Sequence, residues 1–199
     1  MIRAPRSRHM VNGLEPCDCL WIKRERRRLA QYVDFEHMTF ESFEGNDEAK
    51  RVLKAFARKE NSYRFVVLKG PTGTGKTHLS VAAIKAAHEA GIVARIAYVS
   101  RLFDELRQAI ELETGDEVFR YYADTPLLAI DDQGLENATN WTAERWDYLI
   151  NERYTLGVKT IIGTNLDTNK IPARIADRIF DAQYGITIEL QGDSHRGRR

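Results

Sequence analysis

The eight residues Gly70–Thr77 constrain the fold of this chain more than any other segment. They read GPTGTGKT, which fits the pattern G-x-x-x-x-G-K-[ST], and they stand between an apolar run at 64–69 and a helical pattern at 76–90. Glycines let backbone amides turn inward around an anion, and a helix N-terminus adds the positive end of its dipole. The segment therefore predicts a strand, a phosphate-binding loop and a helix in succession, with a nucleoside triphosphate as the ligand.

The polar residues of this phosphate loop have separate expected tasks. Lys76 is expected to reach the β- and γ-phosphates, and the Thr77 hydroxyl is expected to coordinate Mg²⁺. Backbone amides supply the remaining contacts. The predicted nucleotide-binding residues of this segment are Gly70, Pro71, Thr72, Gly73, Thr74, Gly75, Lys76, Thr77 and His78.

The rest of the chain alternates between strand and helix patterns. Apolar runs predict four more strands, at residues 93–99, 126–130, 158–164 and 185–190, with helical patterns between them. Ser100 is expected to cap the helix that follows the second strand. This alternation predicts an α/β fold, in which a five-stranded parallel sheet with right-handed crossovers is flanked by helices.

The strand predicted at 126–130 ends in two acids, Asp131 and Asp132. Because the carboxyl ends of parallel strands meet at one edge of a sheet, Asp131 is expected beside the phosphate loop, where it can hold the Mg²⁺ shell. Asp132 is the expected catalytic carboxylate, since it can polarise the attacking water. Aspartate is one methylene shorter than the more common glutamate, so we expect slow hydrolysis.

Polar residues also follow the last two predicted strands. Thr164 and Asn165 end the strand at 158–164, and a polar side chain at that tip can bind the γ-phosphate or the attacking water. Arg196 follows the final strand, where it can touch the phosphates of its own subunit. We therefore expect all three residues near the triphosphate.

Two arginines share one face of the helix predicted around residues 172–180. Arg174 and Arg178 are four residues apart and flank Asp177. They predict either a surface ion-pair ladder, which contributes little to stability, or an arginine finger that reaches the γ-phosphate of a neighbouring subunit.

In their order, these motifs resemble the AAA+ ATPases that load bacterial replicative helicases, the DnaC and DnaI type; the IstB-like transposition ATPases share much of the pattern. The resemblance covers roughly residues 35–196. It includes residues 39–43, Thr-Phe-Glu-Ser-Phe, a segment that in such proteins lies near the adenine. The motifs that carry it are the phosphate loop, Leu-Leu-Ala-Ile-Asp-Asp, Gly-Thr-Asn, Arg-Ile-Ala-Asp-Arg and Asp-Ser-His-Arg.

The resemblance implies ATP with Mg²⁺ as the ligand, a sheet in the strand order 5-1-4-3-2, and an AAA+ core without a C-terminal helical lid. It implies that Thr164 and Asn165 form the first sensor and Arg196 the second. Arg178 would be the catalytic arginine finger, with Arg174 beside it. It also implies self-association through the ATP sites, single-stranded DNA along an inner surface, and a replicative helicase or other DNA-processing protein as partner.

The N-terminal residues 1–35 differ from the rest in charge, because they hold eight basic and four acidic residues. We therefore divide the chain into a basic extension, 1–35, and an ATPase domain, 36–199. The extension reads either as part of a zinc knuckle or as a tag remnant. Cys17 and Cys19 with His9 supply too few ligands for a closed zinc site, which needs four, so we expect no zinc.

The composition excludes several classes of protein. With 43% hydrophobic and 30% charged residues in 199, the chain is neither wholly disordered nor fibrous. No apolar run approaches the length of about 18 residues that a membrane span needs, and the arginine-rich N-terminus lacks the apolar core of a secretory signal. The two cysteines are too close in sequence for an ordinary disulfide. We therefore expect an intracellular, cytoplasmic protein.

The predicted helices between the second and third strands offer groups that suit single-stranded DNA. Aromatic rings stack on bases and arginines track the backbone phosphates. The candidate contacts are Phe103, Arg107, Arg120 and Tyr121. Ordinary amphipathic packing explains the same four residues equally well.

Other functions remain open. A small-molecule kinase would use the same phosphate loop, but it would leave the sensor and finger motifs without a role. A nucleotide-gated interaction module that hydrolyses weakly fits Asp132 and the short N-terminal region, where helicase loaders carry a helicase-contacting domain. An IstB-like transposition helper is the nearest alternative within the resemblance.

Overall fold

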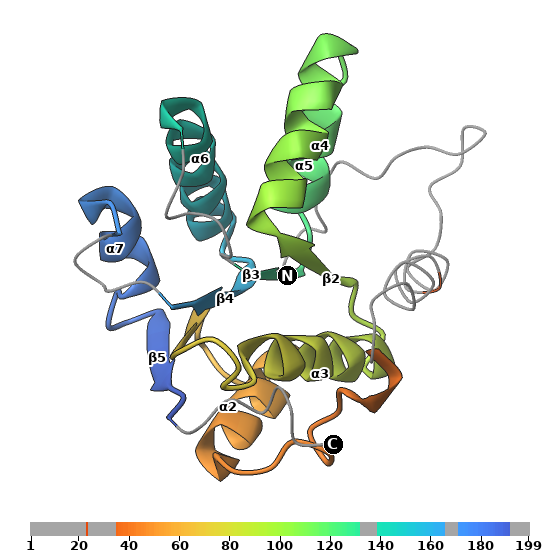
Figure 1. The fold of residues 1–199 in the computed structure, drawn as a ribbon, viewed down its shortest axis with the longest axis vertical. Helices are drawn as coiled ribbons and strands as arrows, with labels where there is room; N and C mark the ends of the chain where they lie inside the picture. Colours follow the sequence, from red (N-terminus) through yellow and green to blue (C-terminus); the bar gives the residue numbers. More distant parts are fainter. Residues whose placement is uncertain (1–22, 24–34, 132–138, 166–170, 192–199) are drawn as a thin grey trace.

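The computed structural model describes residue 23 and residues 35–131, 139–165 and 171–191 (Figure 1). Five strands form one sheet in the order β2-β3-β4-β1-β5, and every neighbouring pair is parallel. This arrangement confirms the predicted α/β class and the predicted order 5-1-4-3-2. The strands are β1 Phe65–Lys69, β2 Ala94–Tyr98, β3 Leu127–Asp131, β4 Lys159–Thr164 and β5 Gly185–Glu189.

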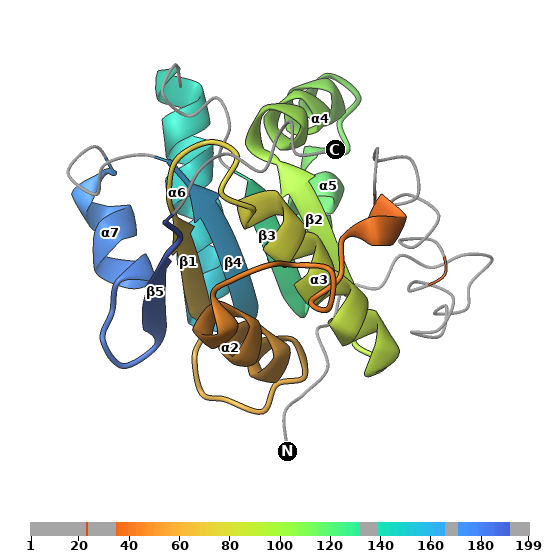
Figure 2. The same cartoon turned by 60° about the horizontal axis from the view of Figure 1, so that its bottom comes forward.

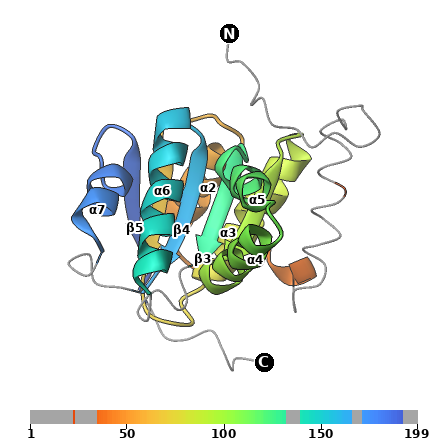
Figure 3. The same ribbon diagram turned by 90° about the horizontal axis from the view of Figure 1, so that it is seen from above.

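Helices cover both faces of the sheet. Figures 1 and 3 show α2 (Asp47–Ala57) and α3 (Lys76–Glu89) on one face. The opposite face carries α4 (Val99–Glu111), α5 (Gly115–Ala123), α6 (Asn140–Leu156) and α7 (Ala173–Ile179). Both faces are packed, because alternate residues of β1 enter different cores: Val66 and Leu68 meet α2 and α3, while Phe65 and Val67 meet the opposite helices. The short helix η1 (Phe35–His37) lies on the side of α2 and α3, where Phe35 joins their core.

The helix starts show which local signals decide a boundary. Asn46 caps α2, since its side-chain oxygen accepts a hydrogen bond from the Ala49 amide at 2.9 Å. The predicted cap at Ser100 is wrong. The chain enters α4 directly from β2, so Tyr98 is the N-cap, with extended backbone, and Ser100 lies in the first turn.

Within the described residues, no helix is both long enough and apolar enough to cross a membrane. The boundary between the extension and the domain stays a prediction, because nearly all of residues 1–34 lie outside the described part. Cys17, Cys19 and His9 lie outside it too.

Candidate nucleotide site

The phosphate loop connects the end of β1 to the start of α3 at the carboxyl edge of the sheet (Figure 2). Its last two glycines, Gly73 and Gly75, have φ angles of 90° and 91°, a left-handed conformation that favours glycine. Gly75 is the N-cap of α3 and offers no side chain to the first helical amides. Those amides are therefore directed at the loop, where an anion can bind them.

Lys76 folds over the loop that it follows. Its side chain is largely buried, and its Nζ donates hydrogen bonds to the backbone oxygens of Gly70 at 2.7 Å and Pro71 at 2.8 Å. The ammonium group therefore lies over the concavity of the loop, as a ligand for phosphate oxygens must. Gly70 itself tolerates no side chain, because an added Cβ would lie 2.4 Å from the Leu190 carbonyl oxygen.

Thr77 and Asp131 meet across the gap between α3 and β3. The Thr77 hydroxyl donates a hydrogen bond of 2.6 Å to Oδ2 of Asp131, whose residue is only 3% exposed at the end of its strand. A hydroxyl and a carboxylate oxygen at the edge of a phosphate loop are the hard ligands that Mg²⁺ prefers. The two residues thus fit a magnesium site, and their role there stays a prediction.

The tip of β4 lies beside the loop. Lys69 is paired with Thr164 in the sheet, and the Gly70 amide donates to the Thr164 carbonyl oxygen at 3.1 Å. Thr164 is buried, whereas Asn165, the next residue, is exposed. The structure therefore brings both predicted sensor residues to the same edge as the phosphate loop.

Arg178 is held by α6 of its own chain. One of its Nη atoms donates to Asn151 Oδ1 at 2.7 Å, and another lies 3.7 Å from a carboxylate oxygen of Asp147. Its backbone partner is the Arg174 carbonyl oxygen, while the Arg174 side chain is exposed. The finger role of Arg178 stays a prediction, and so does the contact of Arg174 with nucleotide.

Two other predicted site residues, Asp132 and Arg196, lie outside the described residues.

The predicted base-stacking role of Phe103 is wrong. The residue is 3% exposed and packs edge-on against Trp141 and Trp146, with ring centroids 6.1 and 6.4 Å away. Leu102 and Leu106 lie in the same core cluster as Phe103. The helical spacing of these apolar residues was the signal in the sequence that indicates a buried Phe103.

The other predicted DNA contacts are more accessible. Arg107 and Arg120 are exposed. The Tyr121 ring is partly buried, and the Arg95 guanidinium lies 3.7 Å from its centroid, which leaves at most one face for a base. The segment 99–123 has three arginines against six carboxylates, so any attraction for phosphates there depends on individual arginines.

A groove between α4, α5 and α6 was not predicted from the sequence. Its volume is about 360 Å³, and its walls include Arg120 and Arg145. Phe119 and Tyr148 also line it, with stacked rings whose centroids are 4.7 Å apart. Phe119 lies on α5 and Tyr148 on α6, so the residue pattern of either helix alone does not reveal the pair.

The match to a protein family covers nearly the whole chain. Residues 21–196 match the model of IstB-like ATP binding proteins. Among curated proteins, an ATP-binding protein in an insertion sequence of Mycobacterium tuberculosis is 26% identical over 187 residues, covering 87% of this chain and 74% of the relative. The chromosomal replication initiator DnaA of Aquifex aeolicus is 28% identical over 183 residues, covering 86% of this chain but only 45% of that protein.

Solved structures show the same fold. The DnaC helicase loader superposes with a TM-score of 0.71 at 21% identity, covering 80% of this chain and all of that one. DnaA bound to AMPPCP and single-stranded DNA superposes with a TM-score of 0.66 at 26% identity, covering 78% of this chain and 50% of that one. The architecture is thus the P-loop AAA+ fold of replication initiators and helicase loaders.

Proposed function

Because this chain belongs to the family of IstB-like ATP-binding proteins, we propose that it binds and hydrolyses ATP and acts on DNA with a DNA-processing partner. The observation that carries the ATP part is the convergence of Lys76, Thr77 and Asp131 at one edge of the sheet. A phosphate loop, a hydroxyl and a buried carboxylate are the parts that triphosphate chemistry needs.

In the proposed reaction each residue has a limited task. The loop amides and Lys76 orient the triphosphate and offset its charge, and Thr77 and Asp131 would hold Mg²⁺, which supplies Lewis-acid stabilisation of the phosphate oxygens when bound. Asp132 follows Asp131 in the sequence and is our choice for the carboxylate that polarises water. Asn165 would orient that water or the γ-phosphate from the neighbouring strand.

Steady-state ATP turnover tests this proposal, with and without single-stranded DNA. Asp131→Asn is expected to lower turnover by about 10²-fold, because it removes a charge that stabilises the reacting phosphates through the metal. The matched control is Asp177→Asn, an exposed carboxylate on α7 that should leave turnover unchanged. A wild-type chain without turnover under all conditions would favour the nucleotide-gated module, and equal turnover in wild type and Asp131→Asn would contradict the site.

The proposed role on DNA has two versions with different support. A helicase-loader role draws support from the shared fold with the DnaC helicase loader. A transposition-helper role draws support from the IstB family match and from the mycobacterial relative in an insertion sequence. In both versions the chain self-associates through its ATP sites and contacts single-stranded DNA, and the solved DnaA complex with AMPPCP and single-stranded DNA is the related precedent.

If single strands follow α4 and α5, the affinity should fall with salt, because each phosphate that an arginine neutralises releases counterions. Arg120→Ala is expected to weaken ATP-dependent binding of a fluorescent oligonucleotide and to reduce the salt slope by about 1. Arg58→Ala, an exposed arginine just after α2 on the other side of the sheet, is the control and should change neither. No binding with ATP present, or a flat salt response, would instead indicate a protein partner.

A further inference from the structure

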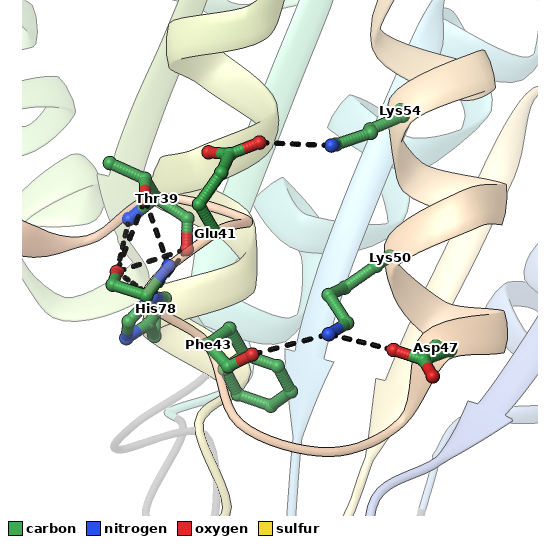
Figure 4. A network of polar contacts seen from close by, with 8 residues as sticks. Thr39, Glu41, Phe43, Asp47, Lys50, Lys54 and His78 are labelled. Carbon is green, nitrogen blue, oxygen red and sulfur yellow. Dashed lines mark hydrogen bonds and ion pairs between the residues drawn. The ribbon is translucent and has the colours of Figure 1, made fainter.

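Residues 39–43 form a tight turn, here called the N-terminal turn, that packs against the first turn of α3 (Figure 4). The Thr39 amide donates to Ser42 Oγ at 3.1 Å, and the Ser42 amide donates to Thr39 Oγ1 at 3.1 Å. Ser42 Oγ also donates to the His37 carbonyl oxygen. These reciprocal bonds fix the turn internally, so any group that holds one part of it holds the whole.

His78 joins this turn to the phosphate loop. Its Nε2 lies 2.8 Å from the Thr39 carbonyl oxygen and 3.3 Å from Ser42 Oγ. Because a carbonyl oxygen only accepts, Nε2 must carry the hydrogen. His78 directly follows Thr77 in the first turn of α3, so its ring connects a segment before the sheet to the helix that holds the phosphate-binding amides.

Phe43, at the end of the same turn, fills the space behind the last glycine of the loop. The residue is 6% exposed, and its ring meets His78 edge-on with centroids 5.2 Å apart. A Cβ added to Gly75 would lie 2.3 Å from a carbon of this ring. The Phe43 carbonyl oxygen accepts a hydrogen bond from Lys50 at 3.3 Å, which secures the turn against α2 from the other side.

We propose that His78 and Phe43 are positioning residues, which hold the phosphate loop in its triphosphate-binding shape by clamping the N-terminal turn onto the start of α3. This inference rests on the proposed function and deepens it. A glycine-rich loop has many accessible backbone conformations, and a ligand must offset the cost of selecting one of them. A ring packed against Gly75 and a bond between His78 and Thr39 restrict the loop before the ligand arrives, so they raise affinity without touching it.

Binding of ATP and of inorganic tripolyphosphate, each with Mg²⁺ and measured by displacement of a fluorescent ATP analogue, tests the proposal. His78→Leu should weaken both ligands by the same factor, roughly tenfold, the size of one net hydrogen bond. His78→Gln should restore most of the affinity, because the glutamine amide nitrogen can donate from nearly the same place as Nε2. Glu48→Gln is the matched control, since Glu48 is exposed in the first turn of α2 and lies outside the N-terminal turn, whose own Glu41 pairs with Lys54 at 3.0 Å.

Three other outcomes would contradict the positioning role of His78. A loss confined to ATP would mean that His78 acts on the nucleoside directly, and no loss for either ligand would also overturn the positioning role. A wild-type chain that binds neither ligand would overturn the proposed function and this inference together. Should His78→Leu fail to fold, Ser42→Ala is the second variant for the same binding measurements. In the nucleotide-free protein, Ser42→Ala should in addition raise amide hydrogen exchange at residues 73–77.

Discussion

Replacing Arg153 by leucine is expected to lower the free energy of unfolding by about 3–5 kcal/mol, the cost of removing one partner from a buried charged network. Arg153 is fully buried in α6. Burial lowers its pKa to about 9, so the guanidinium still carries its charge at pH 7. A buried charge of this kind persists only where its donors are satisfied.

The Arg153 guanidinium is surrounded by backbone oxygens. It donates to the carbonyl oxygens of Tyr122 at 2.7 Å, Ala123 at 3.0 Å and Thr125 at 3.0 Å, which end α5 and lead into β3. It also donates to the Lys159 carbonyl oxygen at 2.5 Å, at the start of β4. Leucine would leave these oxygens buried without their donor, and each such loss costs about 1–3 kcal/mol before relaxation.

Urea unfolding followed by circular dichroism measures the effect of Arg153→Leu. Arg145→Leu, at an exposed position of the same helix, is the control and should change stability by less than about 0.5 kcal/mol. Arg153→Lys should fall between them, because it keeps the charge but offers fewer donors in a different geometry. Equal midpoints for Arg153→Leu and the control would show that water or repacking replaces the guanidinium.

The fold was predictable because its signals are local. Strands β1 to β4 are mostly apolar runs that are buried on both faces, whereas the edge strand β5 is only partly buried. The phosphate loop marks the joint between β1 and α3. Asp131 was also predictable, because a strand that ends in an acid must present it at the carboxyl edge of the sheet. Its hydrogen bond with Thr77 follows from the order of β1, β3 and β4, which parallel βαβ units restrict to few arrangements.

The contacts that sequence reasoning missed join residues that are distant in the chain. The bond between His78 and Thr39 spans 39 positions, and the one between Arg153 and the Tyr122 carbonyl oxygen spans 31. A histidine after a phosphate loop and an arginine within a helix have no local pattern that reveals such partners. Phe103 was missed for a different reason: its chemistry suits a base, but its position on α4 belongs to the apolar face.

Arg178→Ala is expected to lower ATP turnover by about 10³-fold or more while ATP still binds, if Arg178 completes the site of a neighbouring subunit as the family resemblance implies. In this structure Asn151 and Asp147 hold the guanidinium on α6 of its own chain. We expect assembly to exchange or supplement these contacts with the γ-phosphate of the next subunit. Thermal unfolding of Arg178→Ala should accompany the assay, because the loss of the α6 contacts also affects stability.

Mixing two inactive variants distinguishes a finger that acts across subunits from one that acts within its own. A Lys76→Ala subunit lacks a working phosphate loop but still offers Arg178, whereas an Arg178→Ala subunit has the loop and offers no finger. At equal amounts, about a quarter of random head-to-tail interfaces join an intact loop to an intact finger, so part of the activity should return with single-stranded DNA present. Lys76→Ala mixed with Asp131→Asn is the control, because both changes damage the same site and no interface can repair it. If the first mixture recovers no more than the control while both variants assemble, Arg178 does not act across the subunit boundary, and an oligomeric ATPase of the loader type loses its main support.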